Sequence, residues 1–292
     1  MLSSAWLQLA LAFASISTLS AQDILLTNDD GWAVAQISAQ YRELTKARFN
    51  VVLSCSSENK SGTGSRTTTP TVLKELCEYD TCPVGSLLEG PDSTLPHWQP
   101  IPKYSIDATN YGIKILSPKF FSKEPKFVVS GPNISAKLGI LSTAFSGNTG
   151  AQVSYTTLQS DPTMLSSESL WIYFALTAYY MQTILALDVT LGVPLLPEGI
   201  TMNINYPVID SCMNLLDYKW VFSQNLANIG QEDIRTCESM VLPTKKDIIA
   251  AGGCFISVLV LKVTTKADMN AELQAVVYRQ LTKLPFTCLL SS

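Results

Sequence analysis

Residues 24–31 read ILLTNDDG, and this stretch decides the fold on which the rest of the chain builds. Residues 23–27 predict a short buried strand, and the amphipathic run over residues 34–44 predicts the helix that follows it. The glycine that closes the stretch supplies the sharp turn between them. Ligands of open α/β sheets bind beyond the carboxyl ends of the strands, so Asp29 and Asp30 are expected to face a ligand-binding crevice.

The two adjacent acids of this turn leave two interpretations open. Neighbouring carboxylates repel each other unless a cation or a shared proton offsets their charges. Their oxygens suit a hard divalent ion such as Mg²⁺, Mn²⁺ or Ca²⁺. The same Asn-Asp-Asp-Gly pattern is also typical of a polar strand-to-helix turn in which Asp30 caps the helix. The residues alone therefore favour the capped turn over the metal site.

Residues 24–37 (ILLTNDDGWAVAQI) resemble the start of the survival protein SurE family. The resemblance is to its secreted fungal branch in particular, whose members are described as acid phosphatases or nucleotidases. Further blocks match in the same order along the chain. They are residues 56–65 (SSENKSGTGS), 127–133 (FVVSGPN), 145–150 (FSGNTG), 197–207 (PEGITMNINYP) and 235–288. The resemblance therefore covers most of the chain after residue 20, with a weak stretch over residues 152–195.

The resemblance implies an α/β fold in three layers, Rossmann-like in its N-terminal half, with a mixed sheet and a C-terminal strand and helix extension. It implies a divalent metal ion, Mg²⁺ or Mn²⁺, held by Asp29, Asp30, Ser61 and Asn133, with both aspartates also catalytic. Four oxygen donors would leave positions on a hard cation open for water and a phosphate oxygen. The implied substrate-binding residues are Asn28, Ser61, Gly62, Thr63, Ser146, Gly147 and Asn148.

Residues 61–65 (SGTGS) follow an apolar run over residues 50–53 that predicts a second strand. Small residues let the backbone approach an anion, so the N–H and hydroxyl groups of this loop suit a phosphate. Taken as an isolated pattern, the same letters are typical of a flexible Gly/Ser loop. The position of the loop after a strand adds support for the binding role.

Composition excludes several other phosphatase mechanisms. His97 is the single histidine of the chain, and it lies in a polar, proline-bounded segment that is typical of a surface loop. Histidine phosphatases, purple acid phosphatases and Ser-His-Asp hydrolases depend on histidines that the chain does not have or has only once. No cysteine is followed six positions later by arginine, which excludes the phosphocysteine mechanism. Hydrolysis of a phosphoester by this chain would therefore need a metal.

The 292 residues, of which 47% are hydrophobic, suit one large α/β domain, which we place at residues 21–292. A net charge of −4 gives no basic footprint for duplex nucleic acid, although a nucleotide remains a candidate substrate. Residues 7–16 (LQLALAFASI) form an apolar core of signal-peptide length, and residues 18–20 offer small residues for cleavage. We therefore expect residues 1–20 to be a signal peptide and the protein to be secreted, because a membrane anchor this short would span poorly.

Seven cysteines fit an oxidising compartment. A short acidic turn separates Cys77 from Cys82, which predicts a bridge between them. Pairing the remaining cysteines by their order along the chain predicts Cys212 with Cys237 and Cys254 with Cys288. Cys55 is then left over as a buried free thiol. Zinc is the alternative for the Cys-x4-Cys pair, but neither a second pair nor a histidine cluster accompanies it.

The remaining segments give a coarser pattern. Residues 169–187 carry no charge and are long enough for a transmembrane helix, but their polar residues favour a helix buried against the sheet. Residues 83–102, rich in proline and glycine, predict a loop or insertion. Strands are predicted over residues 201–205 and 255–263, and a closing helix is predicted over residues 267–283.

The resemblance, together with the residues above, implies a secreted metal-dependent phosphomonoesterase of acid phosphatase or 5′/3′-nucleotidase type, which uses a metal-bound water. The family often assembles as dimers or larger oligomers, so the resemblance implies a homo-oligomer. The chain departs from the family pattern at Ser135, Lys137, Asn148, Thr149 and residues 156–167. Lys137 suits a phosphate contact and a solvated surface equally. The departures leave a second function open, a secreted pseudoenzyme or binding protein that retains the fold.

Two tripeptides match the acceptor pattern for N-linked glycans. They are Asn59-Lys60-Ser61 in the Ser-Gly loop and Asn133-Ile134-Ser135 at the third matching block. A glycan on Asn133 would remove its carboxamide oxygen from the implied metal site, so an active enzyme requires this residue to be bare. Asn59 lies outside the implied ligand set and tolerates a sugar better.

Overall fold

The structure is a computed structural model of the chain, and the residues that it describes fall into a series of segments. These are residues 22–64, 66–69, 71–86, 98–101, 104–133, 151–154, 175, 178–179, 196–207, 212, 214–227 and 230–289. The expected signal peptide and the block at Ser146, Gly147 and Asn148 lie outside them, as do His97, Ser135 and Lys137.

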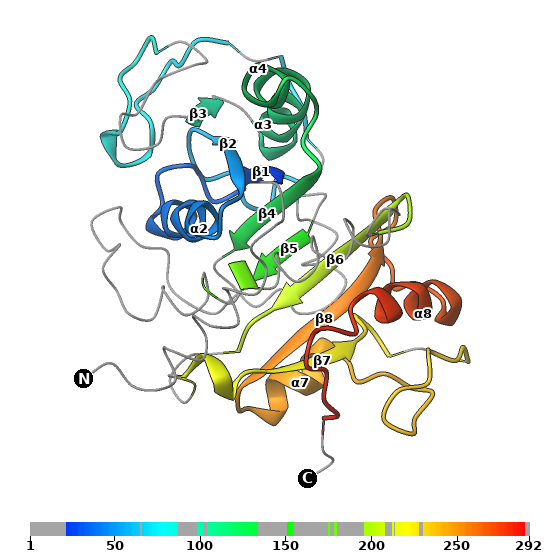
Figure 1. The fold of residues 1–292 in the computed structure, drawn as a ribbon. Helices are drawn as coiled ribbons and strands as arrows, with labels where there is room; N and C mark the ends of the chain where they lie inside the picture. The colour runs from blue at the N-terminus through cyan, green and yellow to red at the C-terminus, as the bar shows by residue number, and fades with distance from the viewer. Residues whose placement is uncertain are drawn as a thin grey trace, which may run out of the picture.

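One sheet of eight strands, in the order β3-β2-β1-β4-β5-β6-β8-β7, runs through the molecule (Figure 1). The first six strands in this order pair in parallel, β6 and β8 pair antiparallel, and β8 and β7 pair in parallel. The sheet is therefore mixed, with a Rossmann-like parallel part at the N-terminal end, and the predicted fold class is confirmed. The strands are β1 (Asp23–Thr27), β2 (Asn50–Ser56), β3 (Trp98–Ile101), β4 (Phe127–Asn133), β5 (Ala151–Ser154), β6 (Ile200–Asn205), β7 (Lys219–Ser223) and β8 (Phe255–Lys262).

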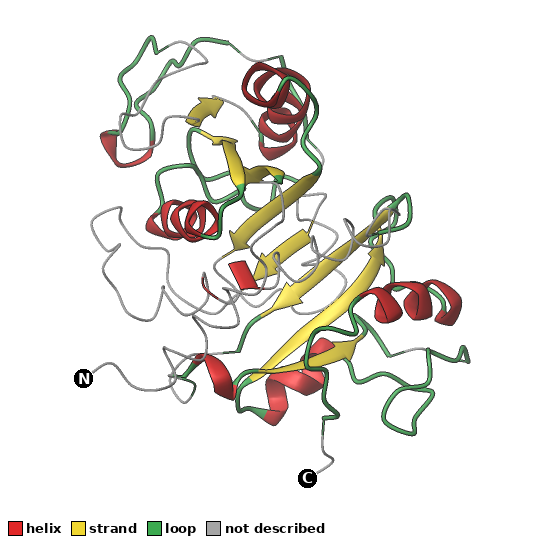
Figure 2. Ribbon diagram, in the orientation of Figure 1, coloured by secondary structure: helices red, strands yellow, loops and turns green. Residues whose placement is uncertain are grey.

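Helices cover both faces of the sheet (Figure 2). On one face, α2 (Ala35–Lys46) packs Ile37 and Leu44 into the same apolar cluster as Ile24 of β1. On the other face, Leu25 of β1 packs with a helical segment built from α3, η2 and α4. The alternation of β1 side chains between the two faces is what a strand buried on both sides requires. The segment consists of α3 (Ser105–Tyr111), η2 (Gly112–Leu116) and α4 (Ser117–Phe121).

Gly112 allows this helical segment to approach the sheet closely. A methyl group at Gly112 would overlap the Leu25 side chain and the Ser54 Cβ atom at 2.6–2.9 Å. Two hydrogen bonds hold the contact, from Ser54 Oγ to the Ala108 carbonyl (2.7 Å) and between the hydroxyls of Thr27 and Thr109 (3.1 Å). The helix therefore packs directly beneath the carboxyl ends of β1 and β2.

The C-terminal part adds β7 and β8 with the helices α7 (Lys245–Ala251) and α8 (Ala271–Gln280). Thr244 and Asp247 form a reciprocal capping box at the start of α7. Around α8, the rings of Phe222, Tyr278 and Phe286 pack in edge-to-face and tilted contacts, with centroids 5.0–5.8 Å apart. Two short helical turns complete the described elements, η1 (Glu78–Asp80) and η5 (Leu215–Asp217).

The predicted strand and helix at the N-terminus and the predicted strands at 201–205 and 255–263 are confirmed. The predicted loop at residues 83–102 is partly wrong, because β3 lies within it and pairs with β2 at the edge of the sheet. An edge strand tolerates proline, which hid it in the sequence. The predicted helix at 267–283 begins only at Ala271, because the Met269 N–H still bonds to the Val260 carbonyl of β8.

The apolar stretch at residues 169–187 falls almost wholly outside the described residues. Its three described positions, Ala175, Ala178 and Tyr179, are helical, and Ala178 is buried. Within the described part of the chain, no helix combines the length and apolarity needed to cross a membrane.

The cysteine pairing corrects the sequence prediction in part. The Cys77–Cys82 bridge and the buried free Cys55 are confirmed. The other two bridges join Cys212 to Cys254 and Cys237 to Cys288, so pairing by order along the chain was wrong. The antiparallel pairing of β6 with β8 explains the first, since the residues after β6 and before β8 meet at the same edge of the sheet. The second bridge involves the C-terminal segment. This segment lies beside β7, because the Thr287 N–H bonds to the Trp220 carbonyl of that strand.

Candidate functional site

The turn after β1 carries three polar side chains that are almost fully buried. Asn28, Asp29 and Asp30 are 0%, 1% and 5% exposed. The Asp30 N–H donates to Asn28 Oδ1 (3.1 Å), which closes a local turn of the kind that Asn favours. The sequence motif therefore gives a turn that holds two acids inside the protein, where an uncompensated pair of charges is costly.

Gly31 ends this turn in a conformation that other residues rarely adopt. Its φ angle is +99°, and a methyl group built on it would overlap the carboxylate of Glu78. The Trp32 N–H then bonds to the Ser56 carbonyl at the end of β2 (3.0 Å). Glycine is therefore required here for two reasons, the positive φ angle and the close approach of a second segment.

The loop after β2 folds back onto the acid pair. Ser61 Oγ donates to Asp30 Oδ1 at 2.5 Å, a short hydrogen bond to a carboxylate, and the Lys60 N–H donates to the Asp29 carbonyl (2.7 Å). The Lys60 ammonium pairs with Glu58 (2.5 Å). Two parallel strands thus bring Asp29, Asp30 and Ser61 together, as the resemblance implied.

The glycines of this loop shape it. Gly62 and Gly64 have φ angles of +77° and +61°. The Thr63 N–H and Thr63 Oγ1 both donate to the Lys60 carbonyl, at 3.2 and 2.7 Å. No described atom lies within 4 Å of a methyl group built on Gly62. The loop is therefore an ordered turn in which Thr63 is bonded internally and the backbone at Gly62 is open to an approaching group.

The third strand end places Asn133 at the same edge. Thr27 of β1 is level with Ser130 of β4, and Asn133 ends β4 three residues further on. Asn133 is in turn level with Ser154 of β5, and Ser154 is level with Asn205 at the end of β6. Carboxyl ends of parallel strands share one edge of a sheet, so the backbone of Asn133 lies on the side of the sheet that carries the acid pair.

Asn205 is a candidate that the sequence reasoning did not single out. Its side chain is 3% exposed, and its amide donates to Asn203 Oδ1 (2.8 Å) and Ser257 Oγ (3.0 Å). The signal in the sequence is the polar pair of the Asn-Ile-Asn run inside an otherwise apolar strand. The structure makes Asn205 a candidate because it places this residue level with Asn133 across the sheet, about 10 Å or two strand spacings away.

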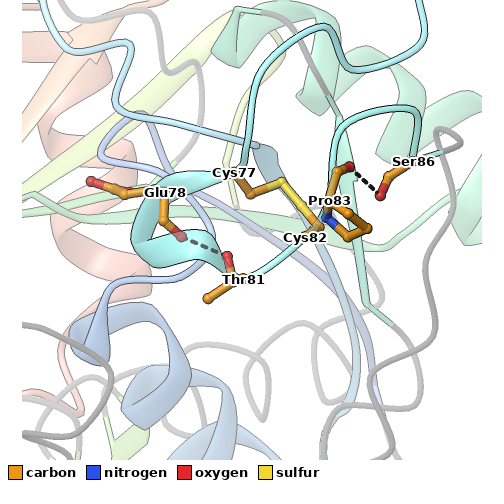
Figure 3. The surroundings of a disulfide bond; sticks show 6 residues. All are labelled: Cys77, Glu78, Thr81, Cys82, Pro83 and Ser86. Carbon is orange, nitrogen blue, oxygen red and sulfur yellow. Dashed lines mark hydrogen bonds between the residues drawn. A yellow bond between two sulfur atoms is a disulfide. The ribbon is translucent and has the colours of Figure 1, made fainter.

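A disulfide-closed turn borders the site and was also missed as part of it. Cys77 and Cys82 close a loop of five positions, and the Cys77 N–H bonds to the Cys82 carbonyl (3.0 Å). Glu78 extends from this turn away from the disulfide (Figure 3). The Glu78 N–H donates to the Ser57 carbonyl after β2 (3.1 Å), and its carboxylate packs against Gly31. The turn therefore positions an acid directly behind the Asn-Asp-Asp-Gly motif.

Cys55 lies beneath the site in β2 and is fully buried. Burial raises the pKa of its thiol far above the ordinary value, and the nearby Asp29 carboxylate raises that pKa further. A thiol that stays protonated is a poor nucleophile. Its role is therefore packing under the Asn28 backbone, to which it is hydrogen-bonded.

The sequence profile described as "Survival protein SurE" matches residues 24–230, which is well over half of the chain and spans every described residue of the site. The chain belongs to the survival protein SurE family. A curated relative in this comparison is a protein named "Acid phosphatase" from Yarrowia lipolytica (strain CLIB 122 / E 150). It is 29% identical over 296 aligned positions, which cover 86% of this chain and 82% of that protein. The resemblance seen in the sequence is therefore confirmed at the level of the family.

The described residues fit a hard divalent cation, the kind on which members of the SurE family generally depend. Asp29 and Asp30 supply buried carboxylate oxygens, and Ser61 supplies a hydroxyl held against Asp30. Oxygen donors of this kind suit Mg²⁺ and Mn²⁺ better than softer metals. A cation beside the acid pair would also offset the cost of burying two neighbouring negative charges.

Proposed function

We propose that this protein is a secreted phosphomonoesterase that depends on a divalent cation, Mg²⁺ or Mn²⁺. Asp29, Asp30, Ser61 and Asn133 would hold the cation. The observation that carries the proposal is the buried Asp29–Asp30 pair with the Ser61 hydroxyl bonded to it, at the carboxyl edge of a parallel sheet. Membership of the SurE family and similarity to a protein named acid phosphatase support the same activity.

Held by these residues, a divalent cation would offset negative charge on the phosphoryl group and would lower the pKa of a bound water towards neutrality. The residues of the chain do the rest. The Asn28 Nδ2 group is buried and has no hydrogen-bond partner among the described residues, so it is placed to donate to a phosphoryl oxygen. The open backbone at Gly62 offers a second approach for the phosphate. Ser146, Gly147 and Asn148 complete the proposed phosphate contacts.

Asp29 and Asp30 also serve as the proposed catalytic carboxylates. One of them accepts the proton released when water attacks the phosphorus atom, and the alcohol leaves with a proton in return. Ser61 fixes the orientation of Asp30 through the 2.5 Å hydrogen bond. The substrate is a small phosphate monoester, with nucleotides included, because a cation can offset their charge despite the net charge of −4 on the protein.

Secretion is part of the proposal. The apolar N-terminal segment, for which we propose cleavage after residue 20, would direct the chain to the secretory pathway. Six of the seven cysteines form disulfides in the structure, which is expected of a protein that matures in an oxidising compartment. Residues 21–292 would then form the mature single-domain phosphatase.

The test is turnover of p-nitrophenyl phosphate by the secreted full chain, before and after treatment with EDTA. We expect EDTA to abolish turnover and either Mg²⁺ or Mn²⁺ to restore it. A panel of 5′- and 3′-nucleotides then separates a general phosphatase from a nucleotidase. Turnover that survives complete metal removal would contradict the cation dependence.

The alternative function, a pseudoenzyme or binding protein, has its own outcome in the same experiment. It predicts no turnover with any metal, together with cation binding that isothermal titration calorimetry detects. Asp30→Asn is the matched control, since it should remove the binding heat under either function.

A further inference from the structure

Both acceptor tripeptides for N-linked glycans lie at the carboxyl edge of the sheet, but their surroundings differ. Asn59 stands in the turn after β2, and its side chain is exposed. Asn133 stands at the end of β4, a strand that pairs with β1 on one side and β5 on the other. The structure therefore separates two sites that the sequence pattern treats as equal.

We propose that Asn59 carries an N-linked glycan while Asn133 stays unmodified. We further propose that the glycan restricts the candidate site to small phosphate esters. The second statement rests on the proposed phosphatase function, whereas the first does not.

The Asn59 side chain already has the local geometry of an acceptor. Its Oδ1 atom accepts the N–H of Ser61 at 2.8 Å, which closes a turn across the three residues of the tripeptide. Oδ1 of Asn59 is thus directed into the loop, and Nδ2, the other atom of the same amide, is the atom that receives the sugar. In the transfer, Nδ2 of Asn59 forms a bond to the anomeric carbon of a polyprenyl-pyrophosphate-linked oligosaccharide. Nδ2 loses one proton, and the polyprenyl pyrophosphate leaves.

The compartment agrees with the modification. The bridges Cys77–Cys82, Cys212–Cys254 and Cys237–Cys288 require an oxidising environment, and N-linked transfer takes place in the same secretory compartment. The remaining cysteine, Cys55, is fully buried and presents no exposed thiol.

Asn133 differs because its backbone is part of the sheet. It is level with Ser154 of the neighbouring strand β5, and strand β4 lies in the interior of the sheet order. A glycan here would be attached beside β5, at the end of a strand in the interior of the sheet order. We therefore expect Asn133 to be bare in the folded, secreted protein.

The position of Asn59 connects the glycan to the candidate site. The next residue, Lys60, donates its N–H to the Asp29 carbonyl, and Ser61 donates its hydroxyl to Asp30. The attachment point is thus two residues from a side chain that contacts the acid pair. A branched oligosaccharide at this rim would exclude a protein-sized phosphoester and leave room for a small one.

The first experiment measures occupancy on the full chain secreted from a eukaryotic host. Peptide mapping after enzymatic deglycosylation in H₂¹⁸O marks each glycosylated asparagine as ¹⁸O-labelled aspartate. We expect the label at Asn59 and none at Asn133. Asn59→Asp removes the acceptor while keeping an oxygen for the Ser61 N–H, so it should lose the glycan mass. Ser61→Thr keeps the acceptor pattern and should retain the glycan mass. An unlabelled Asn59 would overturn the proposal.

The second experiment compares a small and a large substrate. The rate on phosphorylated casein divided by the rate on p-nitrophenyl phosphate is measured for the glycosylated protein, the deglycosylated protein and Asn59→Asp. We expect this ratio to rise by about threefold or more on loss of the glycan, with the small-substrate rate unchanged. An unchanged ratio with Asn59 occupied would overturn the size restriction alone. If no form hydrolyses p-nitrophenyl phosphate, the phosphatase function and the size restriction both fail, while peptide mapping still decides the glycan site.

Discussion

The two ends of the sheet use buried acids in different ways. In the C-terminal part, Asp233 is 1% exposed, and N–H donors reach both of its oxygens, from the Leu242 backbone (2.9 Å) and the Gln274 side chain (2.9 Å). In the N-terminal part, Asp29 and Asp30 are adjacent and sit where a parallel strand ends, with a serine hydroxyl on Asp30. A buried acid bonded within its own scaffold holds structure together, whereas adjacent buried acids at a strand end are what the proposed site requires.

The disulfides follow the same division. The Cys77–Cys82 bridge spans five positions and closes a turn against the site, while the C-terminal bridges span 42 and 51 positions. A hollow of about 630 Å³ also lies in the C-terminal part, lined in part by Phe222, Tyr278 and the Cys237–Cys288 bridge. The acid that lines it, Asp247, is engaged in the cap of α7. The acid in this hollow therefore serves the helix cap, unlike the acid pair of the N-terminal part.

The largest expected effect separates the two kinds of buried acid. Asp29→Asn or Asp30→Asn should lower kcat/KM by roughly a thousandfold or more, because each removes a carboxylate from the reacting centre. The melting temperature should stay close to that of the parent protein. Asp233→Asn is the matched control, and we expect it to lower the melting temperature while the folded fraction keeps its kcat. Near-normal turnover by either site variant would contradict the assignment.

The disulfides should divide stability from activity. Replacing Cys237 and Cys288 by serine should lower the free energy of unfolding by about 4 kcal/mol, and replacing Cys77 and Cys82 by about 2 kcal/mol, since the cost grows with loop length. Loss of the Cys77–Cys82 bridge should nonetheless lower kcat/KM more than loss of the Cys237–Cys288 bridge, because Glu78 and the Gly31 turn depend on the Cys77–Cys82 bridge. Urea unfolding and p-nitrophenyl phosphate kinetics measure the two quantities. Equal effects of both double variants on kcat/KM would remove the distinction.

Gly31→Ala tests the contact between the two segments that border the site. Positive φ alone should cost about 1 to 2 kcal/mol, as in the control Gly85→Ala, where φ is +84° and no atom lies within 4 Å of the added methyl group. At Gly31 the overlap with the Glu78 carboxylate should add about 1 to 3 kcal/mol. Glu78→Ala in the same chain should recover that additional part. A double-mutant cycle with no coupling between positions 31 and 78 would show that the segments act independently.

The smallest effect concerns the cap of α7, far along the chain from the site. Thr244→Ala should cost about 1 kcal/mol of stability and leave turnover unchanged. Hydrogen bonds from the Thr244 side chain and backbone lower the pKa of Asp247 below its ordinary value of 3.8. The lowered pKa means that the ionised acid stabilises the fold above that value, and the contribution is lost as the pH falls through the folded pKa. The melting temperatures of parent and variant should therefore converge in acid, and a constant difference would contradict this.

Local sequence pattern was enough to predict the first strand, the helix after it, and the strands that became β6 and β8. Each of these segments has an apolar periodicity or an apolar run that is typical of the element it forms. β3 was missed because its proline is tolerated only at a sheet edge, and an edge position cannot be read from a local pattern. The block at residues 146–148 and Lys137 lie outside the described residues, and their roles stay predictions.

The sequence by itself determined the chemistry that the protein has at its disposal: an acid pair after an apolar strand, a Ser-Gly loop, a single histidine and an odd number of cysteines. Tertiary structure decided which of these groups meet. The antiparallel pairing of β6 with β8 chose the partner of Cys212, and a turn some 50 residues downstream brought Glu78 against Gly31. Periodicity and turn propensity act over a few neighbouring residues, whereas contacts between strand ends depend on the order of strands in the sheet, which no local pattern contains.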